Sequence, residues 1–134
     1  MKTYSYRVVT DDQRVITSTN CGGVCTHRWD NGDSVDCTNE PIKLVSGHTC
    51  WFDGGVLHRT NGPAVILCGG EEWYKHGRRH RTDGPAIITP NGIVSWWING
   101  QQCYSFEQFC AAANLPSHER IRMRLAYSSE QLPD

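Results

Sequence analysis

The sequence lacks any hydrophobic run near the length of about 20 residues that a membrane-spanning helix requires. No apolar core follows the start Met1-Lys2-Thr3-Tyr4, so no export signal is expected. An excess of one charge sign is also missing, because 13 lysines and arginines stand against 14 aspartates and glutamates. This balance argues against a general nucleic-acid binder that works by counterion release. We therefore expect a soluble cytoplasmic protein with no membrane partner.

Charged and apolar residues are both slightly scarce, at 20% and 38% of the chain. Glycine and tryptophan are abundant instead, with 13 and 5 copies, which indicates many turns and large anchored side chains. A chain of 134 residues is about one domain in length. No linker or low-complexity tract divides it, so a single domain with one core is predicted over residues 1–134.

The cysteine count is odd, with seven residues at positions 21, 25, 37, 50, 68, 103 and 110. In a chain without an expected export signal, this count favours reduced thiols over a disulfide framework. Cys68, Cys103 and Cys110 lie inside apolar runs and are predicted to be small buried hydrophobic residues.

An internal repeat of 22 residues organises the middle of the chain. The segment from Trp51 to Ile66 aligns without a gap with the segment from Trp73 to Ile88, and both contain His-Arg-Thr and Gly-Pro-Ala. A degenerate earlier copy occupies 29–50, and the pattern restarts at Trp96 with one extra residue before it stops at residue 104. Repeats of this length are typically stacked supersecondary units. Each unit buries its apolar surface against its neighbours, because one unit cannot bury that surface alone.

Turn residues divide each copy into short strands. Asn99-Gly100 tolerates positive φ at both positions and is a strong hairpin signal. Asn61-Gly62-Pro63 and Asp83-Gly84-Pro85 are predicted to form the other turn, with glycine in an unusual dihedral and proline fixing the next one. The apolar residues that follow are β-prone. The predicted fold is therefore mainly β, an antiparallel meander of hairpin repeats over 29–104.

Both ends differ from the repeats. Residues 3–19 alternate and predict an opening hairpin, followed by a loop up to residue 28. Ser105 with Gln108 three residues later is a capping-box pattern and predicts a helix to about Ala113. A second helix is predicted from Ser117, with Ile121, Leu125 and Met123 packed back on the sheet. Residues 105–134 would thus form a helical cap that covers the open edge of the stack.

The repeat unit resembles the MORN-variant repeats of bacteriophages, large viruses and bacteria, in its leading Trp51 and Trp73 and in the pattern His-Arg-x-Asp/Asn-Gly-Pro-Ala. The end of the repeats, from Trp97-Ile98-Asn99-Gly100 to Ser105-Phe106-Glu107-Gln108-Phe109, is similar to the short helical tail of phage members. The resemblance covers 51–109 well and 29–50 faintly. It implies successive β-hairpins that serve as a binding scaffold.

His58-Arg59 and His80-Arg81 have the residue types of acid–base catalysis. They recur in register every 22 residues, however, whereas a catalytic group is needed once per site. We interpret them as part of the scaffold, with each histidine bonding the neighbouring turn.

Soft metal ligands gather where the repeat is most degenerate. Cys21, Cys25, His27 and Cys37 could hold a structural zinc ion that replaces the missing core there. Their spacing is irregular compared with zinc-binding cysteine pairs, so buried free thiols are the simpler interpretation and no cofactor is predicted.

The densest basic run extends from Lys75 to Arg81, and the preceding copy has no such charge at the matching positions. A surface specific to this repeat is therefore predicted there, although a solvated strand face is the simpler alternative. Because neighbours on a strand point to opposite faces, Trp96 and Trp97 cannot both be buried on one side. The predicted partner-binding residues are Trp73, Tyr74, Lys75, Arg78, Arg79 and Trp97.

No phosphate-binding glycine loop, nucleophile elbow or paired-carboxylate site is recognisable, so no enzyme is predicted. The resemblance implies a small phage or prophage protein that binds and blocks a host antiviral protein or nucleoprotein complex, as anti-CRISPR and other counter-defence inhibitors do. Three alternatives stay open: a nucleic-acid-binding module, a zinc-binding module and an antitoxin-like immunity protein.

Overall fold

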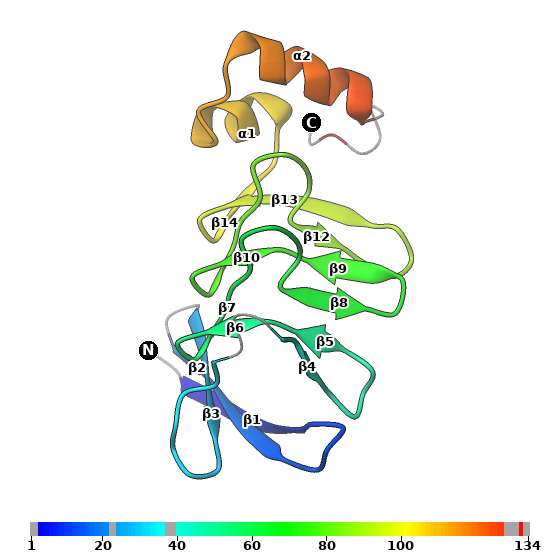
Figure 1. Ribbon diagram of the computed structural model, residues 1–134. Coiled ribbons are helices and arrows are strands. Elements are labelled where there is room, and N and C mark those ends of the chain that lie inside the picture. Colours follow the sequence, from blue (N-terminus) through cyan, green and yellow to red (C-terminus); the bar gives the residue numbers. More distant parts are fainter. Residues whose placement is uncertain (1–2, 22–23, 37–39, 128–131, 133–134) are drawn as a thin grey trace.

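The computed structural model describes residues 3–21, 24–36, 40–127 and 132, and it confirms a mainly β fold with two C-terminal helices (Figure 1). Every pairing between its named strands is antiparallel. The N-terminal sheet lies at one end of the molecule, the hairpin repeats follow, and the helices cover the other end. This order matches the order along the chain, as expected for stacked repeats.

The N-terminal sheet contains three strands in the order β1 (Thr3–Val9), β2 (Val15–Cys21) and β3 (Val24–Trp29). The predicted opening hairpin is confirmed by β1 and β2. The loop predicted after it is wrong, because residues 24–29 pair in continuous register with β2, from Val24 opposite Cys21 to Trp29 opposite Ile16.

Each repeat contributes strands to two sides of the molecule (Figure 1). On one side, a seven-stranded sheet has the order β14-β13-β12-β9-β8-β5-β4. On the other side, β6 pairs with β7 and β10 with β11 in short ribbons, and the second half of β13 forms a third ribbon with β14. The strand bounds are β4 Ile42–Lys43, β5 Thr49–Cys50, β6 Phe52–Asp53, β7 Val56–Leu57, β8 Val65–Leu67, β9 Gly70–Glu72, β10 Tyr74–Lys75, β11 Arg78–Arg79, β12 Ile87–Ile88, β13 Val94–Ile98 and β14 Gln101–Cys103.

The three ribbons share one tight turn, in which both tip residues have positive φ. The φ angles are 58° and 84° at Gly54-Gly55, 51° and 81° at His76-Gly77, and 50° and 83° at Asn99-Gly100. Two consecutive residues with positive φ give the twist that antiparallel strands favour in a two-residue hairpin. The hairpin predicted at Asn99-Gly100 is therefore confirmed.

In each of the two copies with a His-Arg pair, the arginine is held between a tryptophan ring and a proline carbonyl. The Arg59 guanidinium carbon lies 3.8 Å from the ring centroid of Trp51, and its Nη1 donates to the Pro63 carbonyl at 3.1 Å. The next copy repeats both contacts with Arg81, whose distances are 3.9 Å to Trp73 and 3.1 Å to the Pro85 carbonyl. Such cation–π contacts stabilise by about 0.5–2 kcal/mol, depending on how far they are desolvated.

This arrangement corrects the prediction for the glycines of the Gly-Pro-Ala motif. Neither Gly62 nor Gly84 has a positive φ. Glycine is required because the guanidinium lies against the backbone: a Cβ on Gly62 would be 2.9 Å from Cζ of Arg59, and one on Gly84 would be 2.7 Å from Cζ of Arg81 and closer still to the Tyr127 hydroxyl. In both copies, the glycine of the motif therefore leaves space for the arginine side chain. It does not serve to form an unusual turn.

The histidine of each His-Arg pair joins its own copy to the following one. His58 Nδ1 accepts the backbone N–H of His76 at 2.9 Å, and His80 Nδ1 accepts that of Asn99 at 3.0 Å. Both donors are the first tip residue of the next ribbon. Burial lowers the pKa of both histidines, which favours the neutral ring that can accept a hydrogen bond. The predicted bonding of each histidine to the neighbouring turn is thus confirmed.

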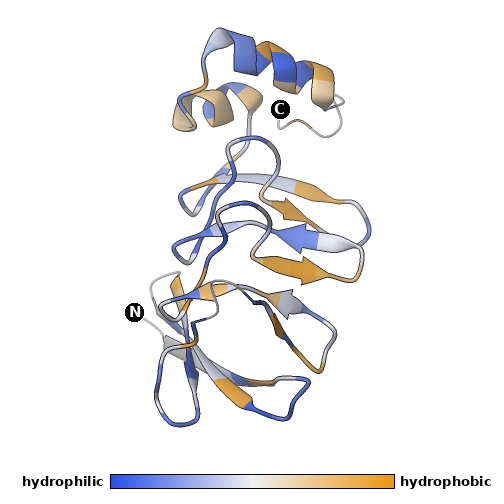
Figure 2. Ribbon diagram, in the orientation of Figure 1, coloured by the Kyte–Doolittle hydropathy of each residue, from blue (hydrophilic) through white to orange (hydrophobic). Residues whose placement is uncertain are grey.

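The apolar core consists of two separate clusters among the described residues, so the prediction of one core is wrong. One cluster joins the N-terminal sheet to the first ribbon through Ile16, Val35, Ile42, Cys50, Phe52 and Val65. The other lies between the last ribbon and the helices and contains Trp96, Ile98, Cys103, Phe106, Phe109, Cys110 and Met123. Figure 2 shows the hydrophilic strand β9 between the hydrophobic strands β8 and β12. Polar contacts therefore carry much of the packing in the repeat between the clusters.

Glu71 of β9 supplies two of these polar contacts. Its carboxylate accepts from Trp73 Nε1 at 2.9 Å and lies 3.5 Å from Nη1 of Arg81. Arg81 also donates through Nε to Asp83 at 2.9 Å. The second arginine stack is thus held by two carboxylates as well as by the ring and the carbonyl.

Helix α1 (Phe106–Ala112) begins where the capping pattern predicts. Ser105 Oγ accepts from the N–H of Gln108 at 3.0 Å, and Gln108 Oε1 accepts from the N–H of Tyr104 at 2.9 Å. The second N–H lies one residue before the N-cap, but the reciprocal bonding is that of a capping box. The N-cap prediction is confirmed.

Helix α2 (Ser117–Ala126) begins at the predicted residue, but its buried face differs from the prediction. Met123 is buried at 3% exposure, whereas Ile121 and Leu125 are 60% and 84% exposed. Residues two apart on a helix are rotated by about 200°, so Ile121 and Leu125 cannot share a face with Met123. Within the described part of the chain, neither helix combines the length and the apolar composition needed to cross a membrane.

The end of α2 also touches the repeats. Tyr127 donates its hydroxyl to the Asp83 carbonyl at 3.2 Å, and its ring lies edge-on to Trp96 with 5.3 Å between centroids. Trp96 itself is 2% exposed. The helices therefore pack on the last apolar cluster and on the turn that carries Gly84.

Two of the three cysteines predicted to be buried are buried, namely Cys103 and Cys110. Cys68 is exposed, so its prediction is wrong. It lies beside Gly69, which has a φ of 83°, in the tight turn between β8 and β9. The apolar run thus continues into a turn, and its last residue points away from the sheet.

We expect Gly84→Ala to lower the free energy of unfolding by about 1–3 kcal/mol, because the new methyl group displaces Arg81 and the Tyr127 hydroxyl. Urea unfolding of Gly84→Ala, Arg81→Ala and the double variant measures this coupling. Removing the arginine relieves one of the two clashes and leaves that with the Tyr127 hydroxyl, so the cost of Gly84→Ala should be smaller, but not abolished, in the Arg81→Ala background. An equal cost in both backgrounds would show that the guanidinium does not set the requirement for glycine.

Candidate functional site

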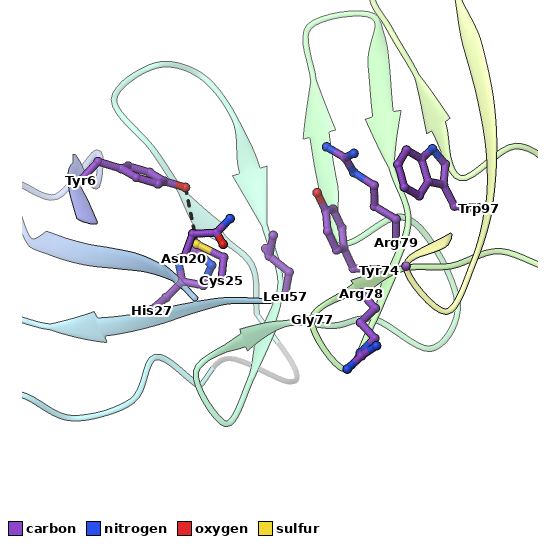
Figure 3. A pocket seen from close by; sticks show the side chains of 11 residues that line it. Tyr6, Asn20, Cys25, His27, Leu57, Tyr74, Gly77, Arg78, Arg79 and Trp97 are labelled. Carbon is purple, nitrogen blue, oxygen red and sulfur yellow. Dashed lines mark hydrogen bonds between the residues drawn. The ribbon is translucent and has the colours of Figure 1, made fainter. Parts of the chain in front are cut away.

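A cleft of about 480 Å³ lies between the N-terminal sheet and the ribbon tips (Figure 3). The N-terminal sheet contributes Tyr6, Asn20, Cys25 and His27 to its wall, and the ribbons contribute the opposite wall. The tip glycines 77 and 100 also line the cleft. At these two turns, the cleft is therefore bordered by the backbone, because glycine has no side chain.

The structure brings four of the predicted partner-binding residues to this cleft: Tyr74, Arg78, Arg79 and Trp97. Trp73 and Lys75 instead line a second cavity of about 330 Å³, next to the His58-Arg59 and His80-Arg81 pairs. Tyr74 lines both cavities. The predicted residues are thus divided between two cavities that share Tyr74.

The two neighbouring arginines have different surroundings. Arg78 is exposed, and no hydrogen bond or ion pair joins its guanidinium to another residue that the structure describes. The Arg79 guanidinium carbon lies 4.8 Å from the ring centroid of Trp97, whose Nε1 donates to Ser95 Oγ at 2.8 Å. Trp97 is half-buried while Trp96 is buried, so the predicted division of the two tryptophans is confirmed.

The described side chains that line the cleft are cationic or neutral. Two arginines line it, and none of its described lining residues is Asp or Glu. Tyr74 donates its hydroxyl to the Glu72 carboxylate at 2.9 Å, and burial together with this carboxylate raises the pKa of Tyr74 to about 12. Tyr74 therefore stays neutral near pH 7.

His27 is a buried polar group of the cleft wall, with 5% exposure. Its Nδ1 lies 2.6 Å from Ser18 Oγ, and its ring lies edge-on to Phe52 with 4.8 Å between centroids. Burial lowers the pKa of His27 to about 4, so the ring is neutral near pH 7. Its Nε2 has no hydrogen-bond partner among the described residues.

The candidate zinc ligands are only partly described. Cys25 and His27 lie two residues apart on β3, and the Cys25 sulfur is 3.8 Å from the Tyr6 hydroxyl. Cys37 and the side chain of Cys21 lie outside the described residues. Within the part that is described, no three His, Cys, Asp or Glu side chains are grouped so as to hold a metal ion. The zinc hypothesis stays a prediction.

Sequence analysis missed Tyr6, Asn20 and Leu57 as cleft residues, and it considered His27 as a metal ligand or as the base of a Cys25 nucleophile. One signal was available for His27, because two-residue alternation on a strand places it on the same face as Cys25. Sequence alone does not show how the N-terminal sheet packs on the first ribbon, and this packing decides what lies opposite that face. In the structure, the His27 N–H donates to the Gly55 carbonyl of the first ribbon at 2.7 Å.

No family model, curated protein or solved structure matches the chain in the three comparisons made. The fold and the cleft define a β-hairpin repeat protein with a cationic, aromatic cleft at its ribbon tips.

The low pKa of His27 predicts acid-sensitive stability. The ordinary histidine pKa is about 6.5, so as the pH falls the unfolded chain takes up this proton before the folded chain does. The contribution is therefore complete above about pH 6.5 and is lost as the pH falls toward 4, with a decrease of about 2–3 kcal/mol by pH 4.5.

Urea unfolding at pH 7.5 and 4.5 measures this loss in the native protein and in two variants. His27→Phe should lack this part of the acid-side decrease, whereas His118→Phe, which changes an exposed histidine on α2, should retain it. An acid-side decrease of the same size in His27→Phe as in the native protein would contradict the assignment.

Proposed function

We propose that this chain is a non-catalytic binding protein that captures an acidic surface of a partner protein in the cleft at its ribbon tips. The observation that carries the proposal is the pair Arg78 and Arg79, which brings two cations to a cleft without acidic residues in its described lining. Guanidinium groups bind carboxylates through parallel hydrogen bonds, which gives both affinity and orientation.

The contrast with the scaffold arginines supports this assignment. Arg59 and Arg81 are each used by a tryptophan ring and a proline carbonyl of their own copy. Arg78 and Arg79 occupy the positions that Val56 and Leu57 hold in the preceding copy, so the repeat itself does not require charge there. Charge placed where the scaffold does not need it is available for a partner.

The aromatic residues of the cleft suit the same role. Tyr6, Tyr74 and Trp97 give it amphipathic walls beside the arginines. Tyrosine, tryptophan and arginine are the residue types that most often dominate binding energy in protein interfaces. The proposal is of binding without catalysis, because the histidines of the repeated His-Arg pairs use Nδ1 to hold the next ribbon.

The resemblance to phage repeat proteins extends the proposal to the partner. We propose a host antiviral protein or nucleoprotein complex as the target, blocked in the cytoplasm of the host cell in the manner of an anti-CRISPR or other counter-defence inhibitor. An antitoxin-like immunity protein would use the same cleft and differ only in its target.

One observation favours a second candidate function, a nucleic-acid-binding module. Arg79 lies over the half-buried Trp97 ring, and the plane of an arginine can also stack on unpaired bases. Such binding would weaken steeply as the salt concentration rises, because each phosphate contact releases counterions.

The direct test is capture of partners from host lysate on the tagged protein, with and without nuclease, followed by mass spectrometry. We expect one stoichiometric protein that survives nuclease treatment. Recovery of nucleic acid alone would favour the second candidate. About one equivalent of zinc in protein purified without chelator, together with loss of fold on its removal, would favour a zinc-dependent module.

The double variant Arg78→Glu/Arg79→Glu should weaken binding of the captured partner by tenfold or more, because two attractive contacts become repulsive. Lys43→Glu/Arg122→Glu is the matched control, since it makes the same charge change at two exposed positions away from the cleft. Titration calorimetry measures both affinities, and thermal unfolding verifies that both variants are folded. Equal affinities of the two double variants would exclude the cleft as the binding site.

A further inference from the structure

Strand β1 is an edge of the N-terminal sheet, and part of its backbone hydrogen-bonding capacity is open. In an antiparallel pair, successive residues of a strand point their N–H and C=O groups alternately toward the neighbouring strand and away from it. The Thr10 N–H donates to the Arg14 carbonyl at 2.8 Å, which extends the register between β1 and β2 by one pair. The even-numbered residues of β1 therefore bond to β2, and the N–H and C=O groups of Ser5 and Arg7 point outward.

The contact at the end of β1 agrees with this alternation. The carbonyl of Val9, which points outward by the same rule, accepts the N–H of Val45 at 2.8 Å. Toward the N-terminus from Val9, no described residue forms a hydrogen bond with the outward backbone groups of Arg7 or Ser5. Both residues are exposed, and Tyr6 between them is 53% exposed. Solvent therefore reaches this part of the edge.

The β1 edge lacks the features that usually protect an edge strand. Proteins protect such edges with short strands, bulges, proline, lysine or a covering segment. β1 is seven residues long, pairs with β2 without a bulge and contains neither proline nor lysine. Its one charged residue is Arg7. An edge of this kind is a template for a further strand.

The opposite edge of the same sheet is already covered by the chain itself. His27 of β3 donates its N–H to the Gly55 carbonyl at 2.7 Å, and its own carbonyl accepts from Val35 at 3.0 Å. The Trp29 N–H donates to the Asp33 carbonyl at 2.8 Å. Because only the β1 edge is open, pairing between two such edges closes after two copies and does not continue into a filament.

We propose that β1 pairs with β1 of a second copy of this chain, antiparallel about a two-fold axis at Ser5. The pairing would join the N-terminal sheets of both copies into one continuous sheet. In this register Ser5 lies opposite Ser5 of the other copy, and Arg7 lies opposite Thr3 of the other copy. These are all outward-pointing residues, so the open N–H and C=O groups of Ser5 and Arg7 obtain partners.

The contact at Val9 favours this register over its neighbours. An axis at Tyr6 would place Thr3 of the other copy opposite Val9, where Val45 already lies. An axis at Arg7 would place Ser5 of the other copy there, and it would also set two arginines directly opposite each other, which is destabilising. An axis at Ser5 avoids both conflicts.

A second copy fits this edge because β1 is itself an extended strand that offers the same groups in return. The inference goes beyond the proposed function and does not depend on it, since Arg78 and Arg79 lie on β11 and not on β1. An acidic strand of another protein, paired with Arg7, is the competing occupant. A protein that stays monomeric would favour that occupant.

The first experiment combines sedimentation with amide hydrogen exchange on the full-length, ¹⁵N-labelled protein. We expect a dimer at high micromolar concentration that dissociates on dilution. The N–H groups of Ser5 and Arg7 should exchange more slowly in the dimer than in the monomer, whereas those of Tyr6 and Val8, which bond to β2, should be protected in both states. A monomer at every concentration would overturn the inference, and so would equal exchange of Ser5 and Arg7 in both states.

The second experiment removes one outward N–H group. Ser5→Pro leaves the bonds to β2 intact and should raise the dissociation constant of the dimer about tenfold or more, because each copy loses a hydrogen bond. Ser5→Ala is the matched control: it removes the same hydroxyl and its 3.1 Å contact with Thr19 Oγ1 but keeps the N–H, so it should dimerise like the native protein. Native affinity in a folded Ser5→Pro variant, or an equal loss in Ser5→Ala, would contradict the edge pairing.

The third experiment tests the position of the axis without proline. Ser5→Lys and Ser5→Glu should each weaken the dimer, because like charges then lie opposite each other across the axis. An equimolar mixture of the two variants should dimerise again, since opposite charges face each other. A mixture as weak as the separate variants would exclude an axis at Ser5.

The proposed function and this inference fail separately. The variant Arg78→Glu/Arg79→Glu should keep the native dimer, because its substitutions lie on β11. Dissociation of that variant would place the contact between copies at the cleft and overturn the pairing of β1. Loss of partner binding in the same variant concerns the proposed function alone.

Discussion

The arginine held between a tryptophan ring and a proline carbonyl is the interaction on which the rest of the structure depends. The two apolar clusters lie toward opposite ends of the molecule, and the repeat that carries Arg81 connects them. Arg81 contacts Trp73, the Pro85 carbonyl, Glu71 and Asp83, and the turn that it braces receives the Tyr127 hydroxyl from the helical end. A planar cation with several donors can join these groups, whereas a lysine at the same position could not.

The arginines and histidines therefore fall into two groups with different roles. Arg59, Arg81, His58 and His80 recur in register, and their side chains are used within the stack. Arg78, Arg79 and His27 do not recur, and they meet at a cleft formed by elements that are distant in sequence. The repeat supplies a rigid surface, and the residues outside its pattern give that surface its chemistry.

The features that sequence could predict are those fixed by neighbours along the chain. The Asn99-Gly100 turn, the Ser105 N-cap and the opposite faces of Trp96 and Trp97 depend on local dihedrals and alternation. The reason for glycine at 62 and 84 could not be predicted, because it depends on the guanidinium that lies against the backbone. The third strand β3, the buried face of α2 and the cleft depend on which elements pack together, and no local pattern encodes that choice.

The measurement that tests the central claim most directly is urea unfolding of four conservative variants: Arg59→Lys, Arg81→Lys, Arg78→Lys and Arg79→Lys. All four keep the charge and remove the planar guanidinium. The account predicts that the first two lower the free energy of unfolding by about 1–3 kcal/mol, because the ring contact and the carbonyl hydrogen bond are lost. It predicts a change within about 0.5 kcal/mol for Arg78→Lys, and a loss smaller than those of Arg59→Lys and Arg81→Lys for Arg79→Lys, which gives up only the ring contact with Trp97. Equal losses in all four variants would contradict the separation of scaffold arginines from binding arginines.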